Sequence, residues 1–198
     1  MIYSTQELYL KYREYKTPHI KIQTELKNER LFPVVRGLYE DDRNTPGYLL
    51  SSYIRPLSYL SFEFALSRYN LIPERVYTIM SAQYGKAHTT TIETNFGTFH
   101  FQDVPKAVFR FGINVVEESG YGYAIATPEK AICDYLCKKP PVSSIRELKN
   151  LLFEDARIDE TELYKLNKED ILFLCPLYGK KNLHLFMKFV ERCNEFYN

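Results

Sequence analysis

Residues 30–40 read RLFPVVRGLYE, in which two short apolar runs lie on either side of Arg36-Gly37. Runs of β-branched and aromatic residues around a glycine are typical of a two-stranded hairpin, because glycine accepts the left-handed backbone of a tight turn. We therefore expect two short strands here, with Arg36 at the tip between them.

Two short helices are predicted before this hairpin. Ser4 and Glu7 have the spacing of a capping box, so the first seven residues should be a helix entry and the helix should reach about Tyr12. Thr17-Pro18 supplies a cap and a first-turn proline for a second helix, which should end near Asn28. The inner side of the second helix is expected to carry Ile20, Ile22 and Leu26.

The order helix, helix, hairpin is that of a winged helix-turn-helix, although little room for the usual extra helix remains between Tyr15 and Pro18. The turn-rich stretch 43–47, RNTPG, is the best candidate for a linker. We therefore expect a winged-helix-like DNA-binding module over residues 1–45. An α+β body with a helical C-terminal segment should follow over residues 46–198.

The pattern of the body predicts a short helix over 61–69 that stops at Asn70, and a second helix from Thr127-Pro128 to Cys137. Alternating or β-branched residues predict several strands, over 75–81, 89–93, 98–104, 113–117 and 121–126. Because their connections are too short for parallel crossovers, we expect an antiparallel sheet. The tail is predicted to be helical over 143–153, 160–166, 169–174 and 182–196.

The net charge is only +1, so any attraction to nucleic acid must come from local clustering of positive charge. Such a cluster lies between residues 11 and 36, where seven cationic side chains face three acidic ones (Glu14, Glu25 and Glu29). The seven are Lys11, Arg13, Lys16, Lys21, Lys27, Arg30 and Arg36. The alternative is that these charges only solvate a small helical cap.

If the module binds DNA, phosphates should be contacted by cationic side chains and bases by polar side chains of the second helix. The candidate phosphate-contacting residues are Lys21, Lys27, Arg30 and Arg36. The candidate base readers are Gln23 and Thr24.

Catalytic candidates are weaker. Glu129, Lys130 and Asp134 invite a nuclease interpretation, but a metal-dependent nuclease needs two or three converging carboxylates, and no strand-borne Asp followed by Glu-x-Lys completes such a set. Glu129 lies in the first turn of a helix, where the dipole favours an acid. The segment 120–123, GYGY, lacks the spacing of a phosphate loop and predicts a hairpin turn, while Cys133 is expected in the core. We expect no enzymatic activity, no cofactor and no metal site.

Four cysteines without a C-x-x-C pair, four scattered histidines and the lack of a targeting segment indicate reduced thiols in a cytoplasmic protein. The chain has no run of 18 apolar residues, so a membrane partner is not expected.

Three stretches together resemble the AbiE antitoxin family of abortive-infection toxin–antitoxin systems. They are the hairpin segment 30–39, the segment 59–74, YLSFEFALSRYNLIPE, and the segment 126–136, ATPEKAICDYL. The second is similar to Ser-x-Glu-x-Ala-Leu-x-x-x-Gly-Leu-Ile-Pro-Glu, with Asn70 in place of Gly. Asn also visits the left-handed region at a helix end. The resemblance covers about residues 3–137.

The resemblance implies an antitoxin that represses its own operon by binding operator DNA and that counters a nucleotidyltransferase-like toxin, in general without a stable complex. The alternative is an interaction antitoxin with a vestigial winged helix that does not bind DNA. The broad apolar face over residues 183–190 fits either closure of the core or a partner surface.

Overall fold

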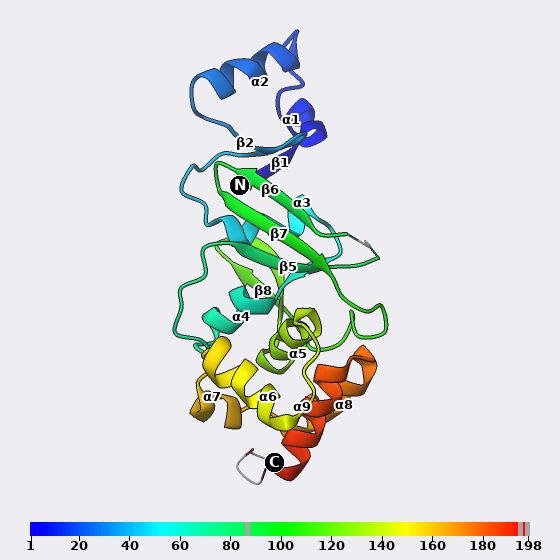
Figure 1. Ribbon diagram of the computed structural model, residues 1–198. Helices are drawn as coiled ribbons and strands as arrows, with labels where there is room; N and C mark the ends of the chain where they lie inside the picture. The colour runs from blue at the N-terminus through cyan, green and yellow to red at the C-terminus, as the bar shows by residue number, and fades with distance from the viewer. Residues whose placement is uncertain (86–87, 194–195, 197–198) are drawn as a thin grey trace.

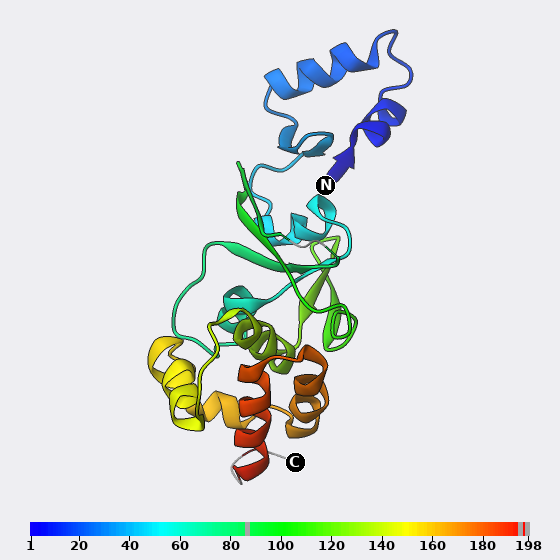
Figure 2. The same cartoon turned by 45° about the vertical axis from the view of Figure 1, so that its right-hand side comes forward.

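The chain forms an α+β fold in three tiers (Figure 1). This computed structural model describes residues 1–85, 88–193 and 196. A small N-terminal module (residues 1–45) lies at one end, a six-stranded sheet lies in the middle, and the C-terminal helices lie at the other end. The same order is seen after a 45° turn (Figure 2), so the module and the helical end are far apart.

The N-terminal module has the predicted two helices and hairpin, and one strand that was not predicted. Its elements are β1 (Ile2–Ser4), α1 (Thr5–Lys11), α2 (Pro18–Lys27), β2 (Phe32–Val35) and β3 (Leu38–Glu40). The strands pair antiparallel in the order β1-β3-β2, and Gly37 turns the hairpin with a φ of 85°. A small core of Leu8, Ile22 and Leu31 joins the helices to this sheet.

The predicted capping box is confirmed, but the residues before it are not a helix entry. Ser4 Oγ accepts a hydrogen bond from Glu7 N at 3.2 Å, and Glu7 Oε2 accepts one from Ser4 N at 2.7 Å. Ile2 and Ser4 lie opposite Glu40 and Leu38 on the free edge of β3. Local pattern missed this strand because its partner lies about 36 residues further along the chain.

The sheet of the body has the order β6-β7-β5-β4-β9-β8. Its strands are β4 (Ser58–Leu60), β5 (Ile79–Gln83), β6 (Thr90–Thr94), β7 (Gly97–Asp103), β8 (Ile113–Glu118) and β9 (Tyr121–Ala126). The hairpins β6–β7 and β8–β9 are antiparallel. The second hairpin turns at Ser119 and Gly120, so of the predicted turn 120–123 only Gly120 lies in the turn, and residues 121–123 belong to β9.

The expectation of a purely antiparallel sheet is wrong, because the sheet is mixed. β5 pairs parallel with β7, and β4 pairs parallel with β9 through Leu60 and Ile125. The prediction considered only the connections between strands that follow one another in the sequence, and those connections are too short for parallel crossovers. Both parallel pairs join strands that are not consecutive: β6 is the return segment between β5 and β7, and β5 to β8 separate β4 from β9.

The body has helices in the predicted segments and, before them, two short elements over residues 47–54 that were not predicted. They are the short 3₁₀ turn η1 (Gly47–Leu50), α3 (Ser51–Ile54), α4 (Phe62–Arg68), α5 (Pro128–Lys138), α6 (Ile145–Lys149), the π-helical turn η2 (Asn150–Asp155), α7 (Glu160–Tyr164), α8 (Lys168–Leu174), the 3₁₀ turn η3 (Cys175–Tyr178) and α9 (Lys181–Arg192). Asn70 ends the α4 region with a φ of 57°, in the left-handed region expected for the residue that replaces Gly. Thr127 Oγ1 caps α5 by accepting from Lys130 N at 3.3 Å.

A buried carboxylate joins the module to the body. Glu40, at the end of β3, accepts a hydrogen bond from Tyr121 Oη of β9 at 2.8 Å, and its Oε1 also accepts from the amino group of Met1. Burial and the Glu40 carboxylate raise the pKa of Tyr121 to about 12, against an opposing hydrogen bond with Thr45, so the phenol stays protonated and donates. Val34 of β2 also belongs to the body core.

The core of the body contains an ion pair with no solvent exposure. Lys130 Nζ lies 3.0 Å from Asp134 Oδ1, one turn further along α5, and both side chains are 0 % exposed. Tyr178 of η3 donates to the same Oδ1 at 2.6 Å and accepts from Lys130 Nζ at 2.8 Å. The pair therefore ties α5 to the turn that precedes α9.

The second oxygen of Asp134 binds the other side of the core. Oδ2 accepts from Tyr59 Oη at 2.9 Å and from Ser61 Oγ at 2.7 Å, so β4 and the start of α4 are bonded to α5. Burial, reinforced by the Asp134 charge, raises the pKa of Tyr59 and of Tyr178 well above the usual range of a phenol. Both hydroxyls therefore stay protonated and act as donors.

Removal of Asp134 should unfold the body more easily. An unpaired buried Lys130 and two freed phenols should make Asp134→Ala about 3–5 kcal/mol less stable to urea, since breaking a buried ion pair leaves an uncompensated charge. Asp134→Ala combined with Lys130→Met should lose less than the sum of the two single changes. Exposed Asp155→Ala is the control and should stay within about 0.5 kcal/mol of the wild type. Additive effects of Asp134 and Lys130 would contradict the coupling.

Two isoleucines of α2 offer a matched test of the module core. Ile22 is buried in that core, whereas Ile20 is 54 % exposed. Ile22→Ala should cost about 2–5 kcal/mol of module stability, because it leaves a cavity between α1 and α2. Faster hydrogen exchange in α1 and α2, with α5 and β9 unchanged, is the expected readout. Ile20→Ala should exchange like the wild type, and equal effects at both positions would refute this assignment.

Candidate nucleic-acid interface

Helix α2 has one buried side and one exposed side. At about 100° per residue, positions 20, 23, 24 and 27 share one side of a helix. Those side chains are all exposed: Ile20, Gln23, Thr24 and Lys27. We call them the outer face of α2. Ile22 and Glu25 are buried on the opposite side. In both ribbon views α2 lies on the module at the end remote from the body (Figures 1 and 2).

The placement of Ile20 corrects the sequence analysis. It was expected on the inner side with Ile22 and Leu26, but about 200° of helix rotation separates positions 20 and 22. Both cannot face the same core. The 3.6-residue period was the signal that would have placed Ile20 outside, beside Gln23 and Thr24.

Both predicted base readers are exposed, but the Thr24 hydroxyl already donates a hydrogen bond within the helix. Thr24 Oγ1 donates to Ile20 O at 2.9 Å within the helix, which uses its proton and leaves the oxygen as an acceptor. Gln23 makes no hydrogen bond from its side chain within the described residues, so its amide is available as both donor and acceptor.

Lys21 differs from the other candidates because it is neutralised within the module. Its Nζ lies 2.5 Å from Glu25 Oε1, one turn further along α2, and 5.1 Å from the centre of the Tyr15 ring. The hydrogen bond to Glu25 raises the pKa of Lys21. Residues four apart on a helix are neighbours, so the spacing of Lys21 and Glu25 predicts this ion pair. A count of charges along the chain does not take the spacing into account. Lys21 thus lies beside the outer face and already has an anionic partner.

Arg30 and Arg36 lie after α2. Arg30 has a 68 % exposed side chain and its guanidinium is 3.9 Å from Glu25, a distant pairing that leaves most donors free. Arg36 is exposed at the turn between β2 and β3. That turn is fixed to α1, because Gly37 O accepts from Thr5 N at 3.0 Å and from Thr5 Oγ1 at 3.3 Å.

The unpaired charge of the stretch 11–36 is positive. Five exposed cations of the stretch 11–36 take no part in an ion pair among the described residues: Lys11, Arg13, Lys16, Lys27 and Arg36. Of its three acids, Glu25 is buried against Lys21 and Glu29 lies 3.9 Å from Arg43. Of these three acids, only Glu14 is exposed without an ion-pair partner among the described residues. The predicted excess of positive charge is therefore available to an anionic ligand.

The other candidates have packing roles. Glu129 is buried and its Oε1 accepts from Asn167 N at 3.0 Å, which holds the turn before α8. Lys130 and Asp134 belong to the buried cluster described above. Cys133 is buried 4.0 Å from the Cys175 sulfur, and burial raises the pKa of its thiol, which disfavours the nucleophilic thiolate. In α9, the side chains that close the core are Leu183, Phe186, Phe189 and Val190.

Two further classes of feature do not occur in the part of the chain that the structure describes. No three side chains of His, Cys, Asp or Glu come together there in a way that would hold a metal ion. Among the helices of residues 1–85, 88–193 and 196, none has the length and apolar character needed to cross a bilayer.

Comparison with known proteins adds no relative to this description. No family model matches the chain, and a search of curated proteins gave no match.

Proposed function

We propose that this chain is a DNA-binding autorepressor and antitoxin of the AbiE type, which binds operator DNA through the outer face of α2. The observation that carries this proposal is the division of α2 into a buried side and an exposed side whose members are Gln23, Thr24, Lys27 and Ile20. A helix of this kind, at the end of a module with unpaired cations, has the shape and charge that a major groove accepts.

In this proposal the module acts as a shortened winged helix-turn-helix. Helix α2 is the recognition helix, and the β2–β3 hairpin is the wing, with Arg36 near a phosphate or a minor groove. Lys27 and Arg30 contact phosphates, Gln23 reads an adenine edge, and Thr24 accepts from a base. Lys21 orders the inner side of α2 through Glu25 and contributes little to the DNA contact. No cofactor or metal is required, and the site of action is the cytoplasm.

The antitoxin part of the proposal is supported by the way two of the AbiE-like segments meet. Tyr59 and Ser61 come from the segment 59–74, and Asp134 comes from the segment 126–136. Their side chains bind one another in the buried core, so the two motifs describe one packing unit. Glu63 of the same segment pairs with Lys139 at 3.1 Å. We propose that this body counters a nucleotidyltransferase-like toxin encoded beside it.

DNA binding should depend on Lys27 and Arg36 more than on Lys21. Fluorescence anisotropy with the duplex upstream of the chain's own gene should show binding that weakens with salt. Lys27→Ala and Arg36→Ala should each weaken binding and reduce the slope of log K against log salt by about 0.9, the value for one lost phosphate contact. Lys21→Ala should leave the slope nearly unchanged, because Glu25 already neutralises it.

Lys181→Ala, on α9 at the opposite end of the molecule, is the control for a general change of charge. Absence of binding at low salt would reject the repressor proposal. So would wild-type affinity in the variant that lacks both Lys27 and Arg36.

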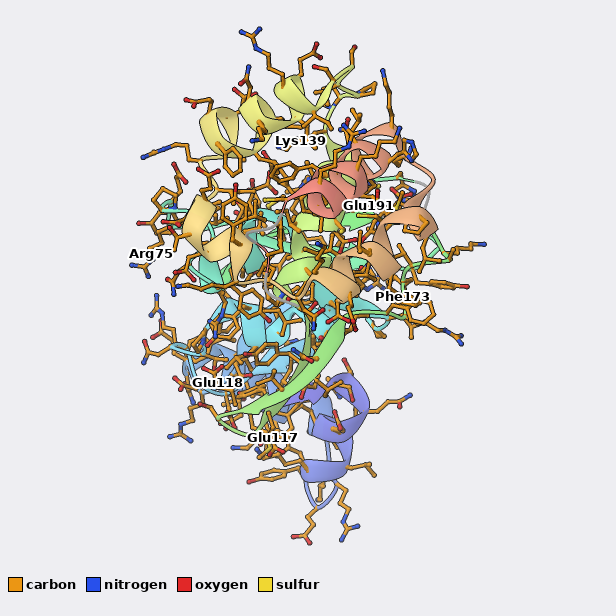
Figure 3. The ribbon with its side chains drawn as sticks, turned by 90° about the horizontal axis from the view of Figure 1, so that it is seen from below. Arg75, Glu117, Glu118, Lys139, Phe173 and Glu191 are labelled. Atoms are coloured by element: carbon orange, nitrogen blue, oxygen red, sulfur yellow. The ribbon has the colours of Figure 1, made fainter. Side chains whose placement is uncertain are left out.

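One observation favours the second candidate function, direct binding of the toxin by the body. Phe111 and Phe173 are 43 % and 53 % exposed, and their rings meet edge to face with centroids 5.2 Å apart. Exposed aromatic pairs are typical of protein interfaces. Figure 3 labels Phe173 on α8, at the surface of the helical end and apart from the module.

Direct toxin binding can be measured by co-expression with the neighbouring gene product. If the body binds it, Phe111→Ala and Phe173→Ala should each reduce recovery of the toxin on a tagged antitoxin at least tenfold, without weakening DNA binding. Tyr77→Ala, which removes another exposed aromatic ring, should recover the toxin normally. Equal loss in all three variants would contradict the Phe111–Phe173 site, and no toxin recovered with the wild type would argue against a stable complex.

A further inference from the structure

An apolar side chain lies within the polar outer face of α2. Ile20 is 54 % exposed, and the residues one turn further along, Gln23 and Thr24, are exposed beside it. Ile20 is not one of the buried or partly buried side chains that form the two hydrophobic clusters of the described residues. A single exposed isoleucine is ordinary on a protein surface, so its position is what matters.

That position is the first turn of α2. Ile20 is the third residue of a helix that begins at Pro18, and the N-terminal part of a recognition helix is the part that contacts base edges. Exposed cations that could hold phosphates lie on both sides along the chain, Arg13 and Lys16 before it and Lys27 after it. The charge around Ile20 therefore fits a polyanion better than it fits a second copy of the same basic surface.

We propose that Ile20 reads sequence by contacting the C5-methyl group of a thymine in the major groove. This inference rests on the proposed DNA binding and names one base of the operator. The thymine methyl is the apolar feature of the major groove, and an apolar side chain is its natural partner. Gln23, three residues later, forms the two hydrogen bonds that select adenine.

The helix spacing also limits where these bases lie. Three residues of α-helix advance about 4.5 Å, and base pairs are stacked about 3.4 Å apart. The thymine read by Ile20 and the adenine read by Gln23 are therefore one or two base pairs apart. Thr24 holds the carbonyl of Ile20 through its hydroxyl at 2.9 Å, so its contact with DNA is through the remaining lone pairs.

The test begins with selection of bound sequences from a random duplex pool by the full-length wild-type chain. In the selected duplex each thymine is then replaced, one at a time, by deoxyuridine, which lacks only the methyl group. One replacement should weaken the wild type about fourfold, the effect of losing one buried methyl. The same replacement should leave the affinity of Ile20→Ala unchanged. The affected thymine should lie one or two base pairs from an adenine whose substitution weakens binding by the wild type but not by Gln23→Ala.

Leu10→Ala is the matched control, since Leu10 is an exposed apolar residue of α1, outside α2. It should keep the full sensitivity to deoxyuridine. If every deoxyuridine substitution affects the wild type and Ile20→Ala equally, sequence-specific binding stands and the inference about Ile20 is overturned. If the wild type selects no sequence and binds no duplex at low salt, both the inference and the proposed function fail. If Ile20→Ala instead converts a dimer into a monomer in ultracentrifugation, with no change in thymine preference, Ile20 faces a second copy of the chain and the inference is again wrong.

Discussion

The ion pair between Lys130 and Asp134 is the interaction on which the body depends. Moving two charges out of water costs several kcal/mol per ion, and the interaction is tolerated only when the remaining donors and acceptors are satisfied. Here both oxygens of Asp134 accept hydrogen bonds, from Tyr59, Ser61 and Tyr178 as well as Lys130. These partners come from β4, the start of α4, α5 and η3. The position of the C-terminal helices on the sheet follows from this arrangement.

This arrangement also limits which side chains are free to bind a ligand. The side chains of the body that resemble an acid–lysine catalytic set are fully engaged in packing. In the stretch 11–36, exposed and unpaired cations lie around α2 and the β2–β3 turn. Helix α2 presents its outer face because Ile22 and the Lys21–Glu25 pair hold its other side against α1 and the loop before it. A core of only three fully buried residues thus orients the proposed recognition surface.

The module and the body are in direct contact. Glu40 binds Tyr121 across the junction, and Val34 of the hairpin packs into the body core. Helix α2, with its outer face, and helix α8, which carries Phe173, lie at opposite ends of the molecule (Figure 1). DNA and a partner protein on these two surfaces would not compete for space. The proposed repression and toxin binding are therefore compatible in one chain.

The sequence by itself determined the local features. These are the Ser4–Glu7 capping box, the glycine turn at Gly37, the left-handed helix end at Asn70 and the cap of α5 at Thr127, which depend on backbone sterics and on hydrogen bonds within three or four residues. It also predicted that positive charge gathers between residues 11 and 36. The structure also showed that Glu25 neutralises Lys21 and that Ile20 is exposed. Both features could have been predicted from the helical spacing of these residues. Only the tertiary structure decided the parallel pairing of β5 with β7 and of β4 with β9, and the third strand of the module. The reason is that strand neighbours and buried partners are selected by contacts between segments far apart in the chain, for which no local pattern is available.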